Sequence, residues 1–207
     1  YHFGPRNFEQ RARSSAPADH RGFYVSASAG AGFAKDAEIK DNLANFDAFG
    51  PGPFAAVAAG YGWKRGLRLE LEASTRRNDA QLIDFNPEFG EGRANGDIRM
   101  RSLMSNVYYD FSRFRGFRPH VGAGIGRTRG TYDVGVRGGT IVEDEDTATA
   151  VHLLVGATTE ISERVAISVG YRVWMGLGFE MEQPDGKLLE TDQLVHTLEA
   201  GLRYSLR

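Results

Sequence analysis

The sequence predicts an all-β protein, folded as an eight-stranded antiparallel up-and-down β-barrel. One observation behind this prediction is a series of runs in which apolar and polar residues alternate. The eight runs cover residues 22–33, 54–63, 67–76, 98–111, 118–127, 148–161, 165–175 and 194–206. Alternation with a period of two places one kind of side chain on each face of a strand. Runs of this length are long for soluble strands and suit tilted strands that cross a bilayer.

The second observation is the order of the connections. Short connections at 64–66, 112–117 and 162–164 alternate strictly with long ones at 34–53, 77–97, 128–147 and 176–193. In an up-and-down barrel this order puts every long connection at one end, and both termini with the short turns at the other. Outer-membrane barrels have short periplasmic turns and longer extracellular loops. We therefore expect a transmembrane β-barrel in the outer membrane of a Gram-negative-type bacterium, with periplasmic termini.

The third observation concerns which face meets lipid. In 67–76, positions 67, 69, 71 and 73 are leucine or alanine, whereas Arg68, Glu70 and Glu72 share the other face. A soluble sandwich or lipocalin-like barrel would also alternate, with its apolar face inside. Two features favour the inverted arrangement: glycines on the polar faces, which a crowded barrel interior needs, and aromatic residues beside the short turns. The predicted aromatic girdle comprises Phe23, Tyr61, Trp63, Tyr109, Phe111 and Tyr204.

The same parity assigns a set of ionisable residues to the barrel interior. Isolated charges there would each cost several kcal/mol, so pairing is expected. We predict that Glu70 and Glu72 face Arg172 and Arg203 across the lumen and that the charges form a salt-bridged plug. The alternative is a narrow, porin-like pore for ions or small solutes. The predicted lumen network comprises Arg68, Glu70, Glu72, Asp110, His152, Glu160, Arg172, Glu199 and Arg203.

No catalytic residue, metal site or cofactor is expected, and the protein is predicted not to be an enzyme. The five histidines show neither triad partners nor metal-ligand spacing. The glycine strings at 28–33 and 122–126 do not spell a dinucleotide motif. An acidic stretch in the third long connection lacks EF-hand spacing and is interpreted as a solvated extracellular loop. The stretch contains Glu143, Asp144, Glu145 and Asp146, and the histidines are His2, His20, His120, His152 and His196.

Several stretches resemble a known family. They are "GFYVSASAGAGF" (22–33), "GLRLELEAS" (66–74), "SNVYYDF" (105–111), "RPHVGAGIG" (118–126), "VGYRV" (169–173) and "HTLEAGLRY" (196–204). In these the chain is similar to the small eight-stranded outer-membrane β-barrels of the OmpA/OmpX/opacity type, the porin-family outer-membrane β-barrel domain. Such barrels usually finish on an aromatic residue, whereas this chain finishes on Leu206 and Arg207. The resemblance implies the architecture and leaves the function open, because these barrels serve many roles.

The chain is predicted to have two parts, a periplasmic arm over residues 1–21 and the barrel over 22–207. The arm shows no periodicity and is rich in Arg, Ser, Ala and Pro. Because the chain opens on Tyr1 without an apolar signal segment, we expect that a signal peptide has been removed. A net charge of −2 gives no indication of a nucleic-acid partner. The expected partners are outer-membrane lipid and lipopolysaccharide, with a protein partner or second copy docking through the arm. The expected function is a structural or interaction scaffold.

Overall fold

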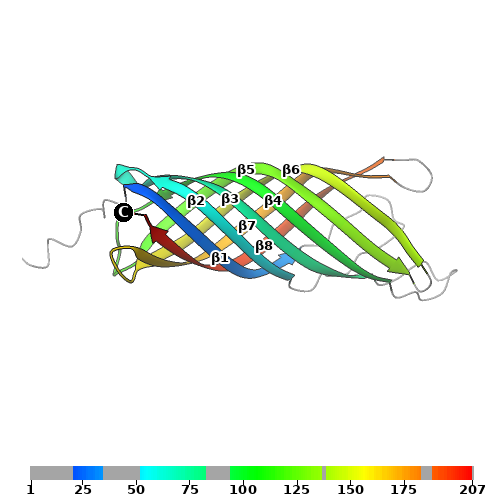
Figure 1. The fold of residues 1–207 in the computed structure, drawn as a ribbon, viewed down its shortest axis with the longest axis horizontal. Coiled ribbons are helices and arrows are strands. Elements are labelled where there is room, and N and C mark those ends of the chain that lie inside the picture. The colour runs from blue at the N-terminus through cyan, green and yellow to red at the C-terminus, as the bar shows by residue number, and fades with distance from the viewer. Residues whose placement is uncertain (1–20, 35–51, 83–93, 137–138, 183–187, 207) are drawn as a thin grey trace, which may run out of the picture.

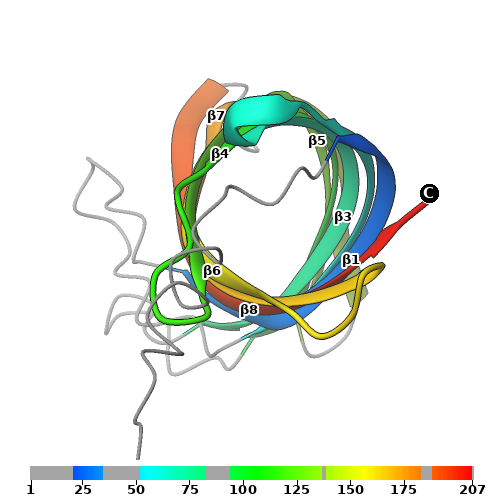
Figure 2. The same ribbon diagram turned by 90° about the vertical axis from the view of Figure 1, so that its left-hand side faces the viewer.

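The computed structural model describes residues 21–34, 52–82, 94–136, 139–182 and 188–206, which form a closed antiparallel β-barrel. Each strand pairs with the next in the chain, and the last pairs with the first (Figures 1 and 2). The strands are β1 Gly22–Ala34, β2 Gly52–Gly62, β3 Leu67–Leu82, β4 Ala94–Asp110, β5 Arg118–Val136, β6 Gly139–Glu160, β7 Val165–Glu182 and β8 Leu188–Ser205. The eight-stranded up-and-down barrel predicted from the sequence is thereby confirmed.

Closure of the barrel is carried by the ladder between β1 and β8. The ladder runs from Tyr24 opposite Ser205 to Ala34 opposite Val195. Hydrocarbon offers no water to unpaired backbone groups, so a sheet inside a bilayer needs such closure. No helix among the described residues is long and apolar enough to span a membrane.

The short-turn end of the barrel has the predicted boundaries. A 3-10 turn, η2 Lys64–Gly66, links β2 to β3, and the starts of β3, β5 and β7 coincide with the predicted ones. Figure 1 shows these short turns and the C-terminus together at one end of the barrel. The aromatic and turn residues on this side make the end of each strand easy to recognise in the sequence.

At the opposite end, three of the four predicted long connections are too long, whereas the first, expected at 34–53, agrees with the end of β1 at Ala34 and the start of β2 at Gly52. Strands β5 and β6 pair as far as Val136 opposite Gly139, through most of the expected loop 128–147. Strands β3, β4, β7 and β8 likewise extend into the expected loops 77–97 and 176–193. One reason is that outward positions beyond the apolar stretch carry arginine, as at Arg77, Arg99 and Arg129, so the apolar pattern of a lipid-facing strand ends although the backbone pairing continues. Backbone pairing does not require an apolar face once the strand has left the bilayer.

Burial alternates along the strands as predicted, with the charged side chains buried and the apolar ones exposed. On β3 the side chains of Arg68 and Glu72 are buried, whereas those of Leu69 and Leu71 are about half exposed, at 48% and 55%. The same pattern runs along β4, where even-numbered residues from 100 to 110 are buried and odd-numbered ones are exposed. The barrel therefore presents its apolar side chains to the surroundings and its charged ones to the interior.

Glycines allow the interior to pack this closely. A Cβ atom added to Gly126 on β5 would lie 2.0 Å from the carbonyl oxygen of Leu103, which is backbone and cannot swing away. By contrast, a Cβ on Gly170 of β7 would meet its nearest neighbour at an ordinary 3.5 Å. The glycine-rich inward faces therefore include positions where any side chain would collide with the next strand.

Candidate functional site

The centre of the lumen holds an ion pair that spans the barrel. Arg172 on β7 donates from Nη1 and Nη2 to the two carboxylate oxygens of Glu72 on β3, at 2.6 and 2.9 Å. Its Nε lies 2.9 Å from Oε2 of Glu199 on the neighbouring strand β8. Strands β3 and β7 are not neighbours in the sheet, so these side chains meet across the interior. We call Arg172, Glu72 and Glu199 the central ion pair group.

A second group lies nearer the short turns. Arg68 on β3 donates to both oxygens of Asp110 on β4, at 2.8 and 3.0 Å, and to Glu70 at 2.7 Å. The hydroxyl of Tyr24 on β1 donates to the same Glu70 oxygen at 2.6 Å. Arg203 on β8 approaches Asp110, with Nη1 3.9 Å from Oδ2. Glu70 is therefore held by its own strand and by β1.

The short-turn mouth carries a third ion pair group. Glu160 at the end of β6 pairs with Arg113 in the turn between β4 and β5, and with Arg118 at 3.4 Å. This group joins two turns that are adjacent on the barrel rim. It holds the mouth of the barrel and is more exposed to solvent than the two groups inside.

Aromatic and apolar side chains fill the lumen on the far side of the central ion pair group. The ring of Phe54 on β2 lies 5.0 Å from the guanidinium carbon of Arg172 and 5.4 Å from that of Arg76. Trp174, which is fully buried, lies 4.2 Å from the Arg76 guanidinium carbon. The three guanidinium nitrogens of Arg76 have no hydrogen-bond partner. The apolar layer comprises Met100, Met104, Ala148, Ala150, Trp174 and Val195.

A small chamber of mixed polar and apolar lining adjoins both the central group and the group nearer the turns. Its volume is about 70 Å³, and its wall includes Arg68, Arg172, Ser26, Ser168 and Gly201. A space of this size, with charged and hydroxyl groups among its lining residues, has room for a few water molecules, each needing roughly 10–15 Å³ of such volume. The ion pairs and the apolar layer close the chamber off toward the far end of the barrel.

The structure places the predicted lumen residues as follows. Arg172 meets Glu72 across the interior, and Glu199 joins them. Glu70 instead pairs with Arg68 from its own strand, two residues away and on the same face. His152 on β6 is buried, and neither ring nitrogen has a hydrogen-bond partner.

Several interior residues are absent from the predicted network. They share the inward parity of the same strands, which is the signal that could have found them. Aromatic rings such as Tyr24 and Trp174, and an arginine without a carboxylate partner such as Arg76, do not look like members of a salt-bridged set. The missed interior residues are Tyr24, Phe54, Arg76, Asn106, Tyr108, Arg118, His120 and Trp174.

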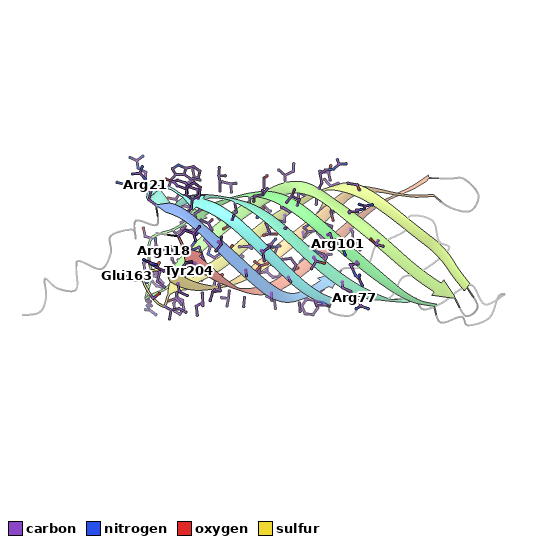
Figure 3. The ribbon with its side chains drawn as sticks, in the orientation of Figure 1. Arg21, Arg77, Arg101, Arg118, Glu163 and Tyr204 are labelled. Atoms are coloured by element: carbon purple, nitrogen blue, oxygen red, sulfur yellow. The ribbon has the colours of Figure 1, made fainter. Side chains whose placement is uncertain are left out.

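The predicted girdle residues lie on the outer wall beside the short turns. Edge-to-face contacts join Phe23 to Tyr61 and Tyr61 to Trp63, each with ring centroids 4.9 Å apart. Tyr109 and Phe111 make a similar contact at 5.1 Å. Figure 3 shows Tyr204 among the many side chains at this end of the barrel. The turn between β4 and β5 adds two exposed aromatic residues that were not predicted, Phe114 and Phe117.

The acidic stretch lies on β6 rather than in a loop, which corrects the predicted placement. Glu143 is opposite Asp133 and Asp146 is opposite Gly130 in the ladder with β5. Both strands continue here because the backbone ladder outlasts the apolar pattern. The side chains of these acidic residues lie outside the described part of the structure.

The described histidines have different surroundings. The Nδ1 of His196 on β8 is 2.6 Å from the Tyr171 hydroxyl on β7, on the outer wall. In the lumen, His120 Nδ1 lies 3.3 Å from the Thr158 hydroxyl. Within the described ranges, no three histidine, aspartate or glutamate side chains gather in a way that could hold a metal ion. His2 and His20 lie outside the described residues.

Taken together, the closed antiparallel sheet, apolar outer wall and ion-paired interior define a small outer-membrane β-barrel. Residues 11–205 match the family described as "Outer membrane protein beta-barrel domain", and the chain belongs to that family. The family resemblance seen in the sequence is thereby confirmed. The predicted location of the barrel in the bacterial outer membrane is confirmed as well. None of the curated protein sequences matches the chain.

Solved structures of other outer-membrane barrels share the fold. Neisserial surface protein A is 21% identical with a TM-score of 0.60, covering 89% of this chain and 97% of that one. OprG from Pseudomonas aeruginosa is 12% identical with a TM-score of 0.53, covering 90% and 98%. A major outer membrane protein from Thermus thermophilus is 14% identical with a TM-score of 0.50, covering 88% and 100%. At these identities the likeness concerns the fold alone.

Proposed function

We propose that this barrel is a non-enzymatic structural or interaction scaffold of the outer membrane, and that its lumen does not conduct. The single observation that carries the proposal is the central ion pair group. Arg172 is 1% exposed and is bonded to carboxylates from both β3 and β8. The apolar layer around Trp174 lies directly beyond it. An ion would have to displace both layers to cross.

Conductance in planar lipid bilayers tests this proposal directly. We expect no stepwise conductance from the unmodified protein. The triple variant Arg172→Ala, Glu72→Ala and Glu199→Ala, combined with Trp174→Ala, should remove the central ion pair group and the largest side chain of the apolar layer, and should produce discrete channels. Discrete channels from the unmodified protein would overturn the proposal and support the narrow pore for ions or small solutes.

We further propose that both termini are periplasmic and that residues 1–21 dock on a partner subunit or on the periplasmic mouth of a barrel. The short turns and the C-terminal strand end lie at the same end of the molecule (Figure 1). The residues of the aromatic girdle adjoin these short turns along the chain. This grouping resembles the periplasmic side of outer-membrane barrels. Deleting residues 1–20 should abolish co-purification of the partner, and unchanged assembly would contradict docking through the arm.

A further inference from the structure

Four arginines line a groove on the outer wall, away from the short turns. The groove has a volume of about 700 Å³, and its lining residues come mainly from β3, β4 and β5 and include Ala73 and Leu103. All four arginine side chains are exposed. Figure 3 shows Arg101 on the half of the barrel remote from Tyr204 and the turns. We call Arg99, Arg101, Arg127 and Arg129 the arginine groove.

The groove sits at the border of the apolar band. On β4 the outward side chains run from Phe111 at the girdle to Leu103, and Arg101 is the next outward position. Ten residues separate Arg101 from Phe111, which is about 34 Å along an antiparallel strand. With the usual tilt of about 40° this becomes roughly 25 Å across the membrane, the height of the apolar band in such barrels. The arginine groove therefore lies at the headgroup level of the leaflet opposite the girdle.

The cross-strand register brings like charges together in the groove. Arg101 on β4 is directly opposite Arg129 on β5, and Arg127 is opposite Leu103 one outward position nearer the band. Side chains directly opposite in an antiparallel ladder have Cβ atoms about 4.5–5.5 Å apart, and like charges at such positions are destabilising. Arg129 and Arg99 also have other interactions, and an anion that accepts hydrogen bonds from two guanidinium groups at once would add a further attraction that offsets this repulsion.

Acidic positions lie farther out along the same strands. By register, Asp97, Asp133 and Glu143 occupy one row across β4, β5 and β6. That row is four residues beyond Arg101, roughly 13 Å along the strand. Glu145 is nearer, opposite Thr131 in the ladder between β5 and β6. Along these strands, arginines thus come next to the apolar band and acidic residues follow beyond them.

We propose that the arginine groove binds the phosphate groups of lipopolysaccharide, a multiply phosphorylated glycolipid, while its acyl chains lie on the apolar band beside the groove. A phosphate is doubly charged and accepts bidentate hydrogen bonds from guanidinium groups, which matches closely spaced arginines better than a zwitterionic headgroup would. Thr75 and Thr147 at the groove edges add hydroxyl groups to the site. The proposal uses the periplasmic placement of the termini, which puts the groove in the outer leaflet.

Binding can be measured on the full chain, purified and delipidated in detergent, where neither orientation nor conductance matters. The probes are bisphosphorylated lipid A, the same lipid A without phosphates, phosphatidylglycerol and inorganic phosphate. Native mass spectrometry and a titration give the retained lipid and its dissociation constant. We expect bisphosphorylated lipid A to bind at least about tenfold more tightly than each other probe, as lost charge-assisted hydrogen bonds imply.

The decisive variant is Arg101→Gln with Arg129→Gln, which should weaken lipid A binding by about tenfold or more. Its matched control, Arg65→Gln with Arg164→Gln, removes two exposed arginines at the short-turn end and should bind like the wild type. Substituting the same groove pair with lysine should give an intermediate affinity, because charge remains but the bidentate fork is lost. Far-UV circular dichroism verifies folding, and the single change Arg127→Gln provides a milder second measurement.

Three results would overturn the proposal. The groove variants could bind lipid A as tightly as the control pair does. Lipid A without phosphates, or phosphatidylglycerol, could bind as well as the bisphosphorylated form, which would make the surface a general lipid site. Inorganic phosphate could compete at concentrations equal to those of lipid A, which would make it a free-anion site. None of these outcomes bears on the closed lumen, so the scaffold proposal is tested separately.

Discussion

Replacing Arg172 with methionine should destabilise the barrel strongly. The substitution keeps a long side chain over Phe54 but removes the cation that Glu72 and Glu199 share. Glu72 would retain only the hydrogen bond from Asn106, at 3.2 Å. Removing one partner of a buried ion pair costs about 3–5 kcal/mol, because the remaining charge stays buried and unpaired. We therefore expect the free energy of unfolding to fall by about 4 kcal/mol.

The assay is urea unfolding of the barrel in lipid vesicles, followed by tryptophan fluorescence. The chain has two tryptophans, so a Trp63→Phe background leaves Trp174, which lies beside the central ion pair group through Arg76. A second variant, with Glu72→Gln and Glu199→Gln added to the methionine substitution, removes the stranded carboxylates. It should recover most of the lost stability, since an ion pair replaced as a whole is often close to neutral.

Two results would refute this reasoning. A loss below about 1 kcal/mol for the single change would show that water reaches the carboxylates, because exposed pairs contribute only that much. Equal losses in the single and the triple variant would show that packing around Phe54, rather than charge, sets the stability.

Three further predictions follow from the interior and the girdle. Gly126→Ala should lower the free energy of unfolding by about 1–3 kcal/mol, because the added Cβ would collide with a backbone carbonyl oxygen. Gly170→Ala should lower it by less than about 1 kcal/mol. Equal urea midpoints for the two variants would contradict this prediction. Lipids brominated near the headgroup should quench Trp63 but not Trp174, and quenching of both would contradict the buried placement of the latter. Arg76→Met should change the free energy of unfolding by about 1 kcal/mol or less, because the Arg76 guanidinium makes no hydrogen bond. A loss near ~4 kcal/mol would show that the contacts of Arg76 with aromatic rings dominate its contribution to stability.

Much of the fold could be predicted because the bilayer imposes strict alternation. The starts of β3 at Leu67 and β7 at Val165 were readable from the turn residues before them and the apolar parity after them. The far ends of β5 and β6 could not be predicted, because outside the apolar band both faces of a strand meet water. Apolar and polar residues then no longer alternate. Strand pairing there is set by the backbone ladder, which has no side-chain signature of its own.

The alternation along each strand predicted which side chains point into the lumen, but it did not predict which of them pair with one another. Alternation along β3 indicates that Glu70 and Glu72 both point inward, yet only Glu72 reaches across to Arg172. Which side chains meet depends on their heights along the barrel axis, and those heights follow from strand tilt and stagger around the whole sheet. The sequence of a single strand does not indicate that stagger. Arg76 illustrates the same limit, since nothing in its neighbours along the chain indicates its aromatic contacts.

The ladder between β1 and β8 also shapes how the protein folds. Its two strands are separated by almost the whole chain, and Leu206 still donates a backbone hydrogen bond to Phe23 at 2.9 Å. The first strand to be synthesised therefore keeps an open edge until the last one is made. Such an edge is costly in hydrocarbon and prone to mispairing in water. A partial barrel is unstable in both lipid and water, so we expect insertion and closure to occur together in one late, cooperative step, with the unfinished chain needing protection until then.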